Sequence, residues 1–184
     1  MKKVLMLLTG VFFIAVSCTE NFEEINTNPN AVTSPEPALL FNRIVTTPVF
    51  DYQRNVNLFA DFYSQYWANT VSGFESGRYE YVDGWAFTGW SAFFVDELAN
   101  IKSLQRLYGD DPFYSNLMQV LEIWEVSEWA RMMAYYGDLP YFEVDFASKV
   151  PYDSERDIYY DLFDRLNNAV NAIDASDTNQ YVMP

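Results

Sequence analysis

The chain has 184 residues, with 26 acidic against 11 basic side chains and a formal net charge of −15 at pH 7. A protein this acidic is repelled by nucleic acid and by anionic headgroups, which excludes nucleic-acid binding as a function class. Because the sequence has no histidine and one cysteine, Ser-His-Asp and Cys-His nucleophile systems and zinc sites built on His and Cys are also excluded.

Residues 1–17 are typical of a bacterial signal sequence. Two lysines form a positive n-region, and Val4 to Val16 is an apolar core too short for a permanent membrane helix, which needs roughly 20 residues. The run ends in Ala-Val-Ser-Cys, so Cys18 resembles the lipidated cysteine of a lipobox. Two or more acyl chains there would anchor the mature chain stably. The alternative is an ordinary signal peptide whose cysteine falls at this position by chance.

Residues 18–33 are predicted to form a polar tether after the lipidated cysteine. Glu20, Glu23 and Glu24 follow Cys18 closely and resemble the acidic surface-export signal of some outer-membrane lipoproteins. A plain solvated linker is the alternative. Without residues 1–17, nine basic side chains face 26 acidic ones, so the mature chain would carry a net charge of about −17.

Residues 34–184 are predicted to form a single all-α region that begins with two helices. Ser34-Pro35 has the pattern of an N-cap followed by proline at the first helical position. Pro48 predicts that this helix ends near Thr47. A second helix is expected over residues 51–70.

Three further helices have clear boundaries in the sequence. Apolar spacing from Thr88 onward predicts a helix that stops at Gly109, and Asp111-Pro112 begins another that ends at Gly137. Ser154 to Asp157 resembles a capping box and begins a final helix. The link of about three residues after the third helix predicts an antiparallel hairpin. Stacked hairpins of the tetratricopeptide type, rather than a closed bundle, are the expected architecture.

Carboxylates are the remaining candidates for chemistry, as a glycosidase pair or as oxygen ligands for calcium. Glu125 and Glu128 could be nominated as a pair, but their i, i+3 spacing on an expected helix is typical of a solvated face. The seven glycines match no phosphate-binding loop. We therefore predict that the protein is not an enzyme and has no catalytic residue, metal site or cofactor.

Two sequence strings toward the C-terminal end are more informative about the protein's family than any helix pattern. They are YYGDLPYFEVDF (Tyr135 to Phe146) and VPYDSERDIYYDLFDRLNNAVNAID (Val150 to Asp174). Gly137 predicts a left-handed helix end, and Pro140 prevents the helix from resuming. Together with the lipobox and the opening NFEEINTNPNAVTSPEPALLFNRI (Asn21 to Ile44), these strings resemble the SusD/RagB family of outer-membrane nutrient-binding lipoproteins.

The resemblance implies a helical binding protein that is lipid-anchored through Cys18 and faces the cell exterior. Members of that family cover a TonB-dependent, SusC-like transporter and capture oligosaccharides, or in some members peptides, for import. The same partners are therefore expected here. The resemblance covers only the first part of the family's usual length. A fragment of a longer product and a truncated, nonfunctional one both stay open, and in either case the last helix would expose an apolar face.

The best ligand-binding candidate is the segment from Gly77 to Phe87. If this segment is extended, side chains alternate, and one side presents Tyr79, Tyr81, Asp83 and Trp85. Aromatic faces beside a carboxylate suit sugars. The alternative is that these aromatic residues pack the junction between the second and third helices. The alternative functions are a surface glycosidase and a structural adaptor without a ligand site of its own.

Three other tryptophans are expected on helices, in core or partner-facing positions. They are Trp67, Trp124 and Trp129.

Overall fold

The structure is a computed structural model that describes residues 35–144 and 149–178, without the side chains of residues 49–55 and Glu75. The predicted signal sequence, the Cys18 tether and the Ser34 cap lie outside the described residues. Among the described residues, no helix is both long and apolar enough to cross a membrane.

The first helical run continues without a break from Pro37 to Tyr63. It consists of α3 (Pro37–Tyr52), the π-helical segment η1 (Gln53–Ala60) and α4 (Asp61–Tyr63). The predicted break at Pro48 is wrong, because this proline lies inside α3. A proline in a helix interior removes one backbone hydrogen bond, and its ring clashes with a carbonyl group of the preceding turn. Together these effects destabilise a helix by about 3 kcal/mol. Packing of α3 against α6, which buries Ile44 completely, outweighs that cost.

The predicted end of the second helix near Thr70 is also wrong. The chain leaves the helix at Gln65, a non-glycine residue with φ of 61°, and the Tyr66 amide donates back to the Asp61 carbonyl oxygen at 3.0 Å. This left-handed residue ends the helix as a C-cap glycine would. Trp67 therefore lies beyond the helix and is 62% exposed.

The second run starts five residues earlier than Thr88. It consists of α5 (Asp83–Ser91), the π-helical segment η3 (Ala92–Glu97) and α6 (Leu98–Tyr108). The predicted stop at Gly109 is confirmed. A short 3-10 turn, η2 (Glu75–Arg78), lies in the loop between the first and second runs.

The remaining predicted boundaries are confirmed by their capping bonds. The Asp111 carboxylate accepts from the Phe113 amide at 3.0 Å and begins the short η4 (Pro112–Tyr114), which leads into α7 (Ser115–Tyr136). Gly137 ends α7 with φ of 74°. The Ser154 hydroxyl accepts from the Asp157 amide at 3.2 Å and donates to the Asp157 carboxylate at 2.8 Å, and α8 (Glu155–Ala172) follows.

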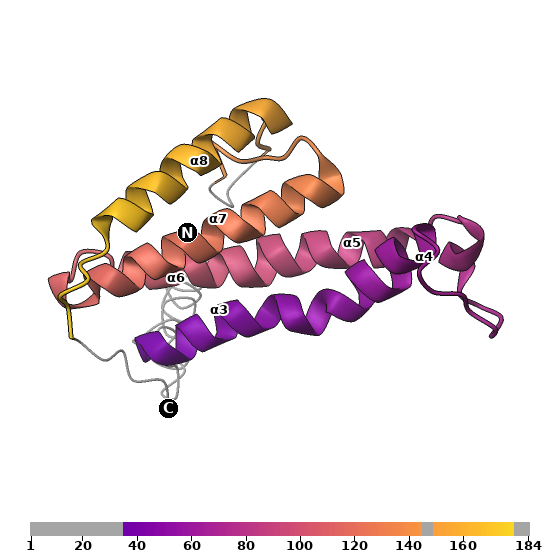
Figure 1. Cartoon of the computed structure of the whole chain (residues 1–184), viewed down its shortest axis with the longest axis horizontal. Helices are drawn as coiled ribbons and strands as arrows, with labels where there is room; N and C mark the ends of the chain where they lie inside the picture. Colours follow the sequence, from indigo (N-terminus) through magenta and orange to yellow (C-terminus); the bar gives the residue numbers. More distant parts are fainter. Residues whose placement is uncertain (1–34, 145–148, 179–184) are drawn as a thin grey trace, which may run out of the picture. The chain divides into compact units, whose positions relative to one another are not determined.

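The helices of residues 36–184 lie side by side in chain order, with α3 next to α6 and α7 next to α8 (Figure 1). The all-α fold of antiparallel hairpins is therefore confirmed. In the described part of the chain, the one extended pairing is an isolated antiparallel bridge between Leu139 and Asp153. Two apolar clusters fill the helix contacts. One joins α3, α6 and α7 through Ile44, Ile101, Leu104 and Leu121. The other surrounds Trp129 and includes Phe93, Met132, Leu139, Ile158 and Leu162.

Candidate ligand site

A pocket of about 310 Å³ lies where α5 meets the C-terminal end of α7. It is called the Trp90 pocket below. Of the four predicted ligand residues, Tyr81 and Asp83 line it, whereas Tyr79 and Trp85 do not. Its lining residues are Tyr81, Asp83, Ala86, Phe87, Trp90, Tyr136 and Tyr152.

The geometry assumed for the predicted segment is wrong from Asp83 onward. Val82 is extended, with φ of −110° and ψ of 97°, but α5 begins at Asp83, so the side chains beyond it follow a helical rather than an alternating pattern. Trp85 consequently turns away from the pocket and packs on Phe74, with ring centroids 5.9 Å apart. This is the packing role that the alternative interpretation gave it.

The segment before α5 is held against the first helical run by aromatic contacts. Tyr81 meets Phe59 edge to face at 6.0 Å, and Tyr79 lies 5.9 Å from Tyr63. The Tyr63 hydroxyl also donates to the Glu80 carbonyl oxygen at 2.7 Å. Tyr81 is 66% exposed despite these contacts, so most of its surface is accessible to a ligand.

The far wall of the pocket comes from residues that the sequence did not predict. The Tyr136 hydroxyl donates to the Ala86 carbonyl oxygen at 2.6 Å, and the Tyr136 ring stands at 88° to Trp90 with centroids 5.3 Å apart. Tyr152 stacks on Trp90 at 6.1 Å and 19°. Burial raises the pKa of the Tyr136 phenol, which keeps it neutral and able to donate. Tyr136 and Tyr152 belong to the YYGDLPY and VPYD strings described above. No local sequence pattern, however, predicts that they lie next to Trp90.

The composition of the pocket defines what it can bind. Aromatic faces can stack on an apolar ring face, the Asp83 carboxylate can accept hydrogen bonds, and no Lys or Arg lines the wall. Among the described residues, no group of three or more His, Cys, Asp or Glu side chains could hold a metal ion. The arrangement can therefore stack on an apolar ring face and accept hydrogen bonds from hydroxyl groups of a ligand.

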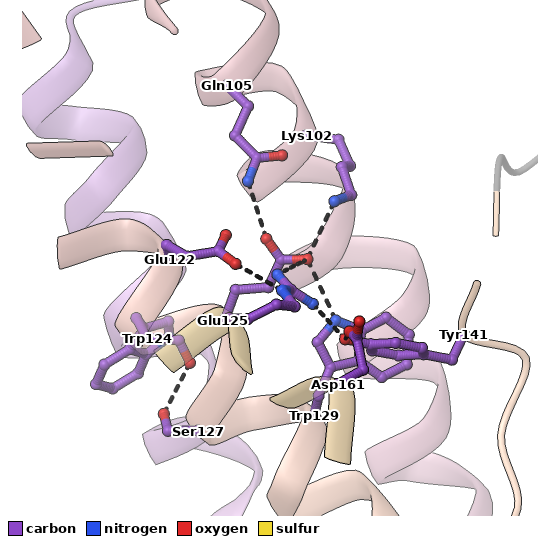
Figure 2. A network of polar contacts seen from close by, with 10 residues as sticks. Lys102, Gln105, Glu122, Trp124, Glu125, Ser127, Trp129, Tyr141 and Asp161 are labelled. Carbon is purple, nitrogen blue, oxygen red and sulfur yellow. Dashed lines mark hydrogen bonds and ion pairs between the residues drawn. The ribbon is translucent and has the colours of Figure 1, made fainter. Parts of the chain in front are cut away.

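The two carboxylates considered for catalysis are structural. Glu125 and Glu128 are 1% and 6% exposed, so the predicted solvated face is wrong. The reason is that α7 is packed on more than one side, against α6 and against α8. Glu125 accepts hydrogen bonds from Lys102 at 3.0 Å and from Gln105 at 2.9 Å, both on α6 (Figure 2).

The same carboxylate also binds residues of its own helix and of α8. The Trp129 indole N–H donates to it at 3.2 Å, and the Arg165 guanidinium lies 3.3 Å away. Burial pushes the pKa of Glu125 upward, but the charges of Lys102 and Arg165 outweigh it, so this pKa lies below its ordinary value. Glu125 therefore joins α6, α7 and α8 through its carboxylate. Because its pKa is lowered, this carboxylate is ionised at neutral pH and cannot act as a general acid there.

Arg165 extends this network to the segment that follows α7. Its guanidinium donates to the Tyr141 hydroxyl at 2.7 Å, and the Tyr141 hydroxyl donates to the Asp161 carboxylate (Figure 2). Arg165 also binds Glu122 on α7. The network fixes α8 and the start of the Leu139–Asp153 connection relative to α7, and Tyr152 reaches the Trp90 pocket from that connection.

Glu128 has a different environment from Glu125. Burial raises its pKa above the ordinary value, and the charge of Arg131, its ion-pair partner one turn along the helix, offsets only part of this. Arg131 also lies 3.5 Å from Glu97, a carboxylate that is 1% exposed and accepts from the Trp124 indole at 3.0 Å. Trp124 and Trp129 lie on α7 as expected, and Trp129 is a core residue that is 1% exposed, whereas Trp124 is half-buried at the edge of the cluster around Ile44.

The stacked hairpins and the absence of strands from the described residues place this chain among the all-α folds. More specifically, the chain belongs to the SusD-like family, because the family model described as "Starch-binding associating with outer membrane" matches residues 29–183. The predicted resemblance is therefore confirmed. No curated protein matches the chain.

Solved structures give the same fold. A chitin-binding protein is 26% identical with a TM-score of 0.68, and the match covers 76% of this chain and 32% of that one. A SusD homologue from Parabacteroides distasonis is 25% identical with a TM-score of 0.63, over 79% and 28% of the two chains. A Bacteroidetes SusD-like protein, AC2a, has 20% identity and a TM-score of 0.64, over 77% and 27%. The chain thus spans about a third or less of the length of these structures.

Proposed function

We propose that this chain is part of a cell-surface lipoprotein that binds oligosaccharides for import through a TonB-dependent outer-membrane transporter. The observation that carries the proposal is the Trp90 pocket, which is lined by Asp83 together with aromatic side chains from α5, α7 and the Tyr152 segment. The family description and the chitin-binding relative support a carbohydrate as the ligand. The proposed role is binding rather than catalysis, because Glu125 and Glu128, the two carboxylates considered for catalysis, are buried and form ion pairs.

In this proposal the ligand ring stacks on an aromatic face, and its hydroxyl groups donate to Asp83. Tyr81 is the most exposed aromatic residue of the pocket at 66%, and Phe87 and Tyr152 are 60% and 62% exposed. These three side chains therefore lose the most accessible surface when a sugar binds. Tyr136 and Trp90 are more buried and form the base on which the ligand rests.

Cys18 is the proposed lipid anchor, and residues 18–33 the tether that holds the binding region outside the outer membrane. Two acyl chains would give stable anchoring, whereas one would not. Replacing Cys18 with alanine should abolish metabolic labelling with a palmitate analogue and release the protein from the outer-membrane fraction. Unchanged labelling in Cys18→Ala would contradict the anchor.

The binding proposal is tested by titrating the 184-residue chain, in detergent, with maltohexaose and chitohexaose by calorimetry. Tyr81→Ala and Asp83→Asn should each weaken binding roughly tenfold, which corresponds to about 1.4 kcal/mol. Tyr160→Ala is the matched control, because Tyr160 has a similar exposure of 61% but lies on α8 outside the pocket. Equal affinities for the wild-type chain and both pocket variants would remove the Trp90 pocket from the proposal.

The structural adaptor and the peptide-binding protein are the competing functions. The adaptor predicts that no saccharide or peptide binds, and that the tagged chain nevertheless recovers a transporter barrel from outer-membrane extract. A peptide-binding protein would respond to a mixed peptide library but to neither hexasaccharide.

A further inference from the structure

A second pocket lies at the C-terminal end of the first helical run, and none of its residues lines the Trp90 pocket. It has a volume of about 240 Å³ and is called the Trp67 pocket below. Its lining residues are Asn57, Leu58, Phe62, Trp67, Ala68 and Asn69. Nothing in the family match or in the names of the relatives assigns a role to it.

The local backbone determines the shape of this pocket. Asn57 and Leu58 lie on the π-helical segment η1, and such segments are frequent at functional sites. The left-handed Gln65 then reverses the chain, and the Trp67 amide donates to the Asp61 carbonyl oxygen at 3.4 Å. The Asn69 side-chain oxygen accepts from the Val71 amide at 2.9 Å. These bonds position the Trp67 and Asn69 segment opposite the helix.

A neighbouring loop supports the helical side of the pocket. Ser76 is fully buried, and its hydroxyl donates to the Leu58 carbonyl oxygen at 2.6 Å. Gly77 lies beside Phe62, and a Cβ atom added there would be 3.5 Å from the ring, an ordinary van der Waals contact. The Phe62 ring is therefore backed by protein on one side. Trp67, in contrast, is 62% exposed, so its indole face is open to a ligand.

The chemistry of the lining selects an uncharged ligand. Two aromatic rings supply stacking surfaces, the Asn69 side-chain amide supplies donor groups, and no ionisable side chain lines the pocket. A sugar ring has the matching properties, with an apolar C–H face and a rim of hydroxyl groups. An anionic sugar would meet no basic partner in the pocket, and the net charge of −15 would repel it.

We propose that the Trp67 pocket is a second saccharide-binding site, selective for uncharged sugars, in which the ring stacks on Trp67 and a hydroxyl group accepts a hydrogen bond from the Asn69 side-chain amide. The identification of the ligand as a saccharide rests on the proposed function above, but the site itself does not share a residue with the Trp90 pocket. A chain with two such sites binds two short oligosaccharides, or two stretches of one polysaccharide, at once.

Nuclear magnetic resonance distinguishes the two sites within one titration, because each contains a tryptophan whose indole N–H gives its own signal. The 184-residue chain in detergent is titrated with maltohexaose, chitohexaose and oligogalacturonate, and the two signals are assigned with Trp67→Phe and Trp90→Phe. Both signals should shift with the two neutral sugars. The Trp67 signal should not shift with oligogalacturonate at tenfold higher concentration.

The outcomes separate the inference from the function on which it rests. A shift of Trp90 without Trp67 overturns the second site and leaves the proposed function standing. A shift of Trp67 without Trp90 supports the second site and overturns the Trp90 pocket. No shift of either signal overturns both. An equal response of Trp67 to oligogalacturonate overturns the selectivity for uncharged sugars.

Calorimetry with matched variants provides the second measurement. Trp67→Ala should reduce the number of hexasaccharide sites from two to one, with the titration of the Trp90 signal unchanged. Tyr66→Ala is the control, since Tyr66 is the adjacent aromatic residue, 83% exposed, and does not line the pocket. Both residues lie outside the helices, so neither variant removes core packing. Two sites of unchanged affinity in Trp67→Ala would overturn the inference.

Discussion

The hydroxyl of Tyr136, the last residue of α7, donates a hydrogen bond of 2.6 Å to the carbonyl oxygen of Ala86 in α5. This bond joins the end of one helix to the middle of another across a large separation in sequence. It also holds the Tyr136 ring at right angles to Trp90. The Tyr136 side chain thus connects α7 to α5 and also forms part of the base of the Trp90 pocket.

Tyr136→Phe should lower the free energy of unfolding by about 1 kcal/mol, the usual contribution of one hydrogen bond. The aromatic packing is retained, so the loss reports the hydroxyl alone. Thermal unfolding followed by circular dichroism measures it. Tyr160→Phe, on an exposed position of α8, should leave the melting temperature unchanged. A Tyr136→Phe chain as stable as the wild type would show that the bond to Ala86 contributes nothing.

Glu125→Gln should destabilise the chain most at neutral pH. The folded-state pKa of Glu125 is lowered, so its ionised form contributes stability that is present above the ordinary value of 4.5 and lost as the pH falls through the folded-state pKa. The difference in stability between wild type and variant should therefore shrink between about pH 5 and pH 3. Urea unfolding at several pH values measures this.

Glu128→Gln, one helical turn away, should show the opposite pH dependence. Its folded-state pKa is raised, so ionisation of the buried carboxyl is unfavourable and opposes folding above the ordinary value of 4.5. The variant should gain stability relative to the wild type as the pH rises from about 4 to 7. Parallel pH profiles for the two glutamine variants would contradict the assignment of opposite environments.

Arg165→Ala should destabilise the chain by about 3 kcal/mol, because it removes a partner from the buried Glu125 carboxylate. It also removes the donor to the Tyr141 hydroxyl. Arg156→Ala is the control on the same helix, at an exposed position. Chemical unfolding of both variants provides the comparison, and similar small effects of the two substitutions would show that the network does not join α7 to α8.

Gly137→Ala and Gly84→Ala should change stability in opposite directions, although neither added Cβ meets an atom within 4 Å. Gly137 has φ of 74°, where a side chain costs about 1–2 kcal/mol. Gly84 is the second residue of α5, where alanine is favoured over glycine by at most about 1 kcal/mol, the value for a helix interior. The two melting temperatures should therefore fall on either side of the wild type. A stabilised Gly137→Ala chain would contradict the conformational explanation.

The helix boundaries that carry a cap were predictable because capping is local. Gly109, Asp111, Gly137 and Ser154 each act on backbone groups within a few residues, so their spacing in the sequence contains the required information. Three boundaries without such a cap were predicted wrongly: the break at Pro48, the helix end near Thr70 and the helix start at Thr88. Pro48 shows why. Its local preference for ending a helix is outweighed by burial of Ile44 against α6, a contact between segments far apart in the chain.

The sequence by itself determined the all-α class, the helix ends at Gly109, Asp111, Gly137 and Ser154, and the family, since these depend on caps, periodicity and short motifs. The tertiary structure decided which polar groups are buried and which aromatic residues form a site. The sequence predicts that Glu125 lies on the surface, but in the structure it is buried because α6 and α8 both pack on α7. Tyr81, Trp90, Tyr136 and Tyr152 share a pocket only because the helices that carry them meet in space, and no local pattern encodes that contact.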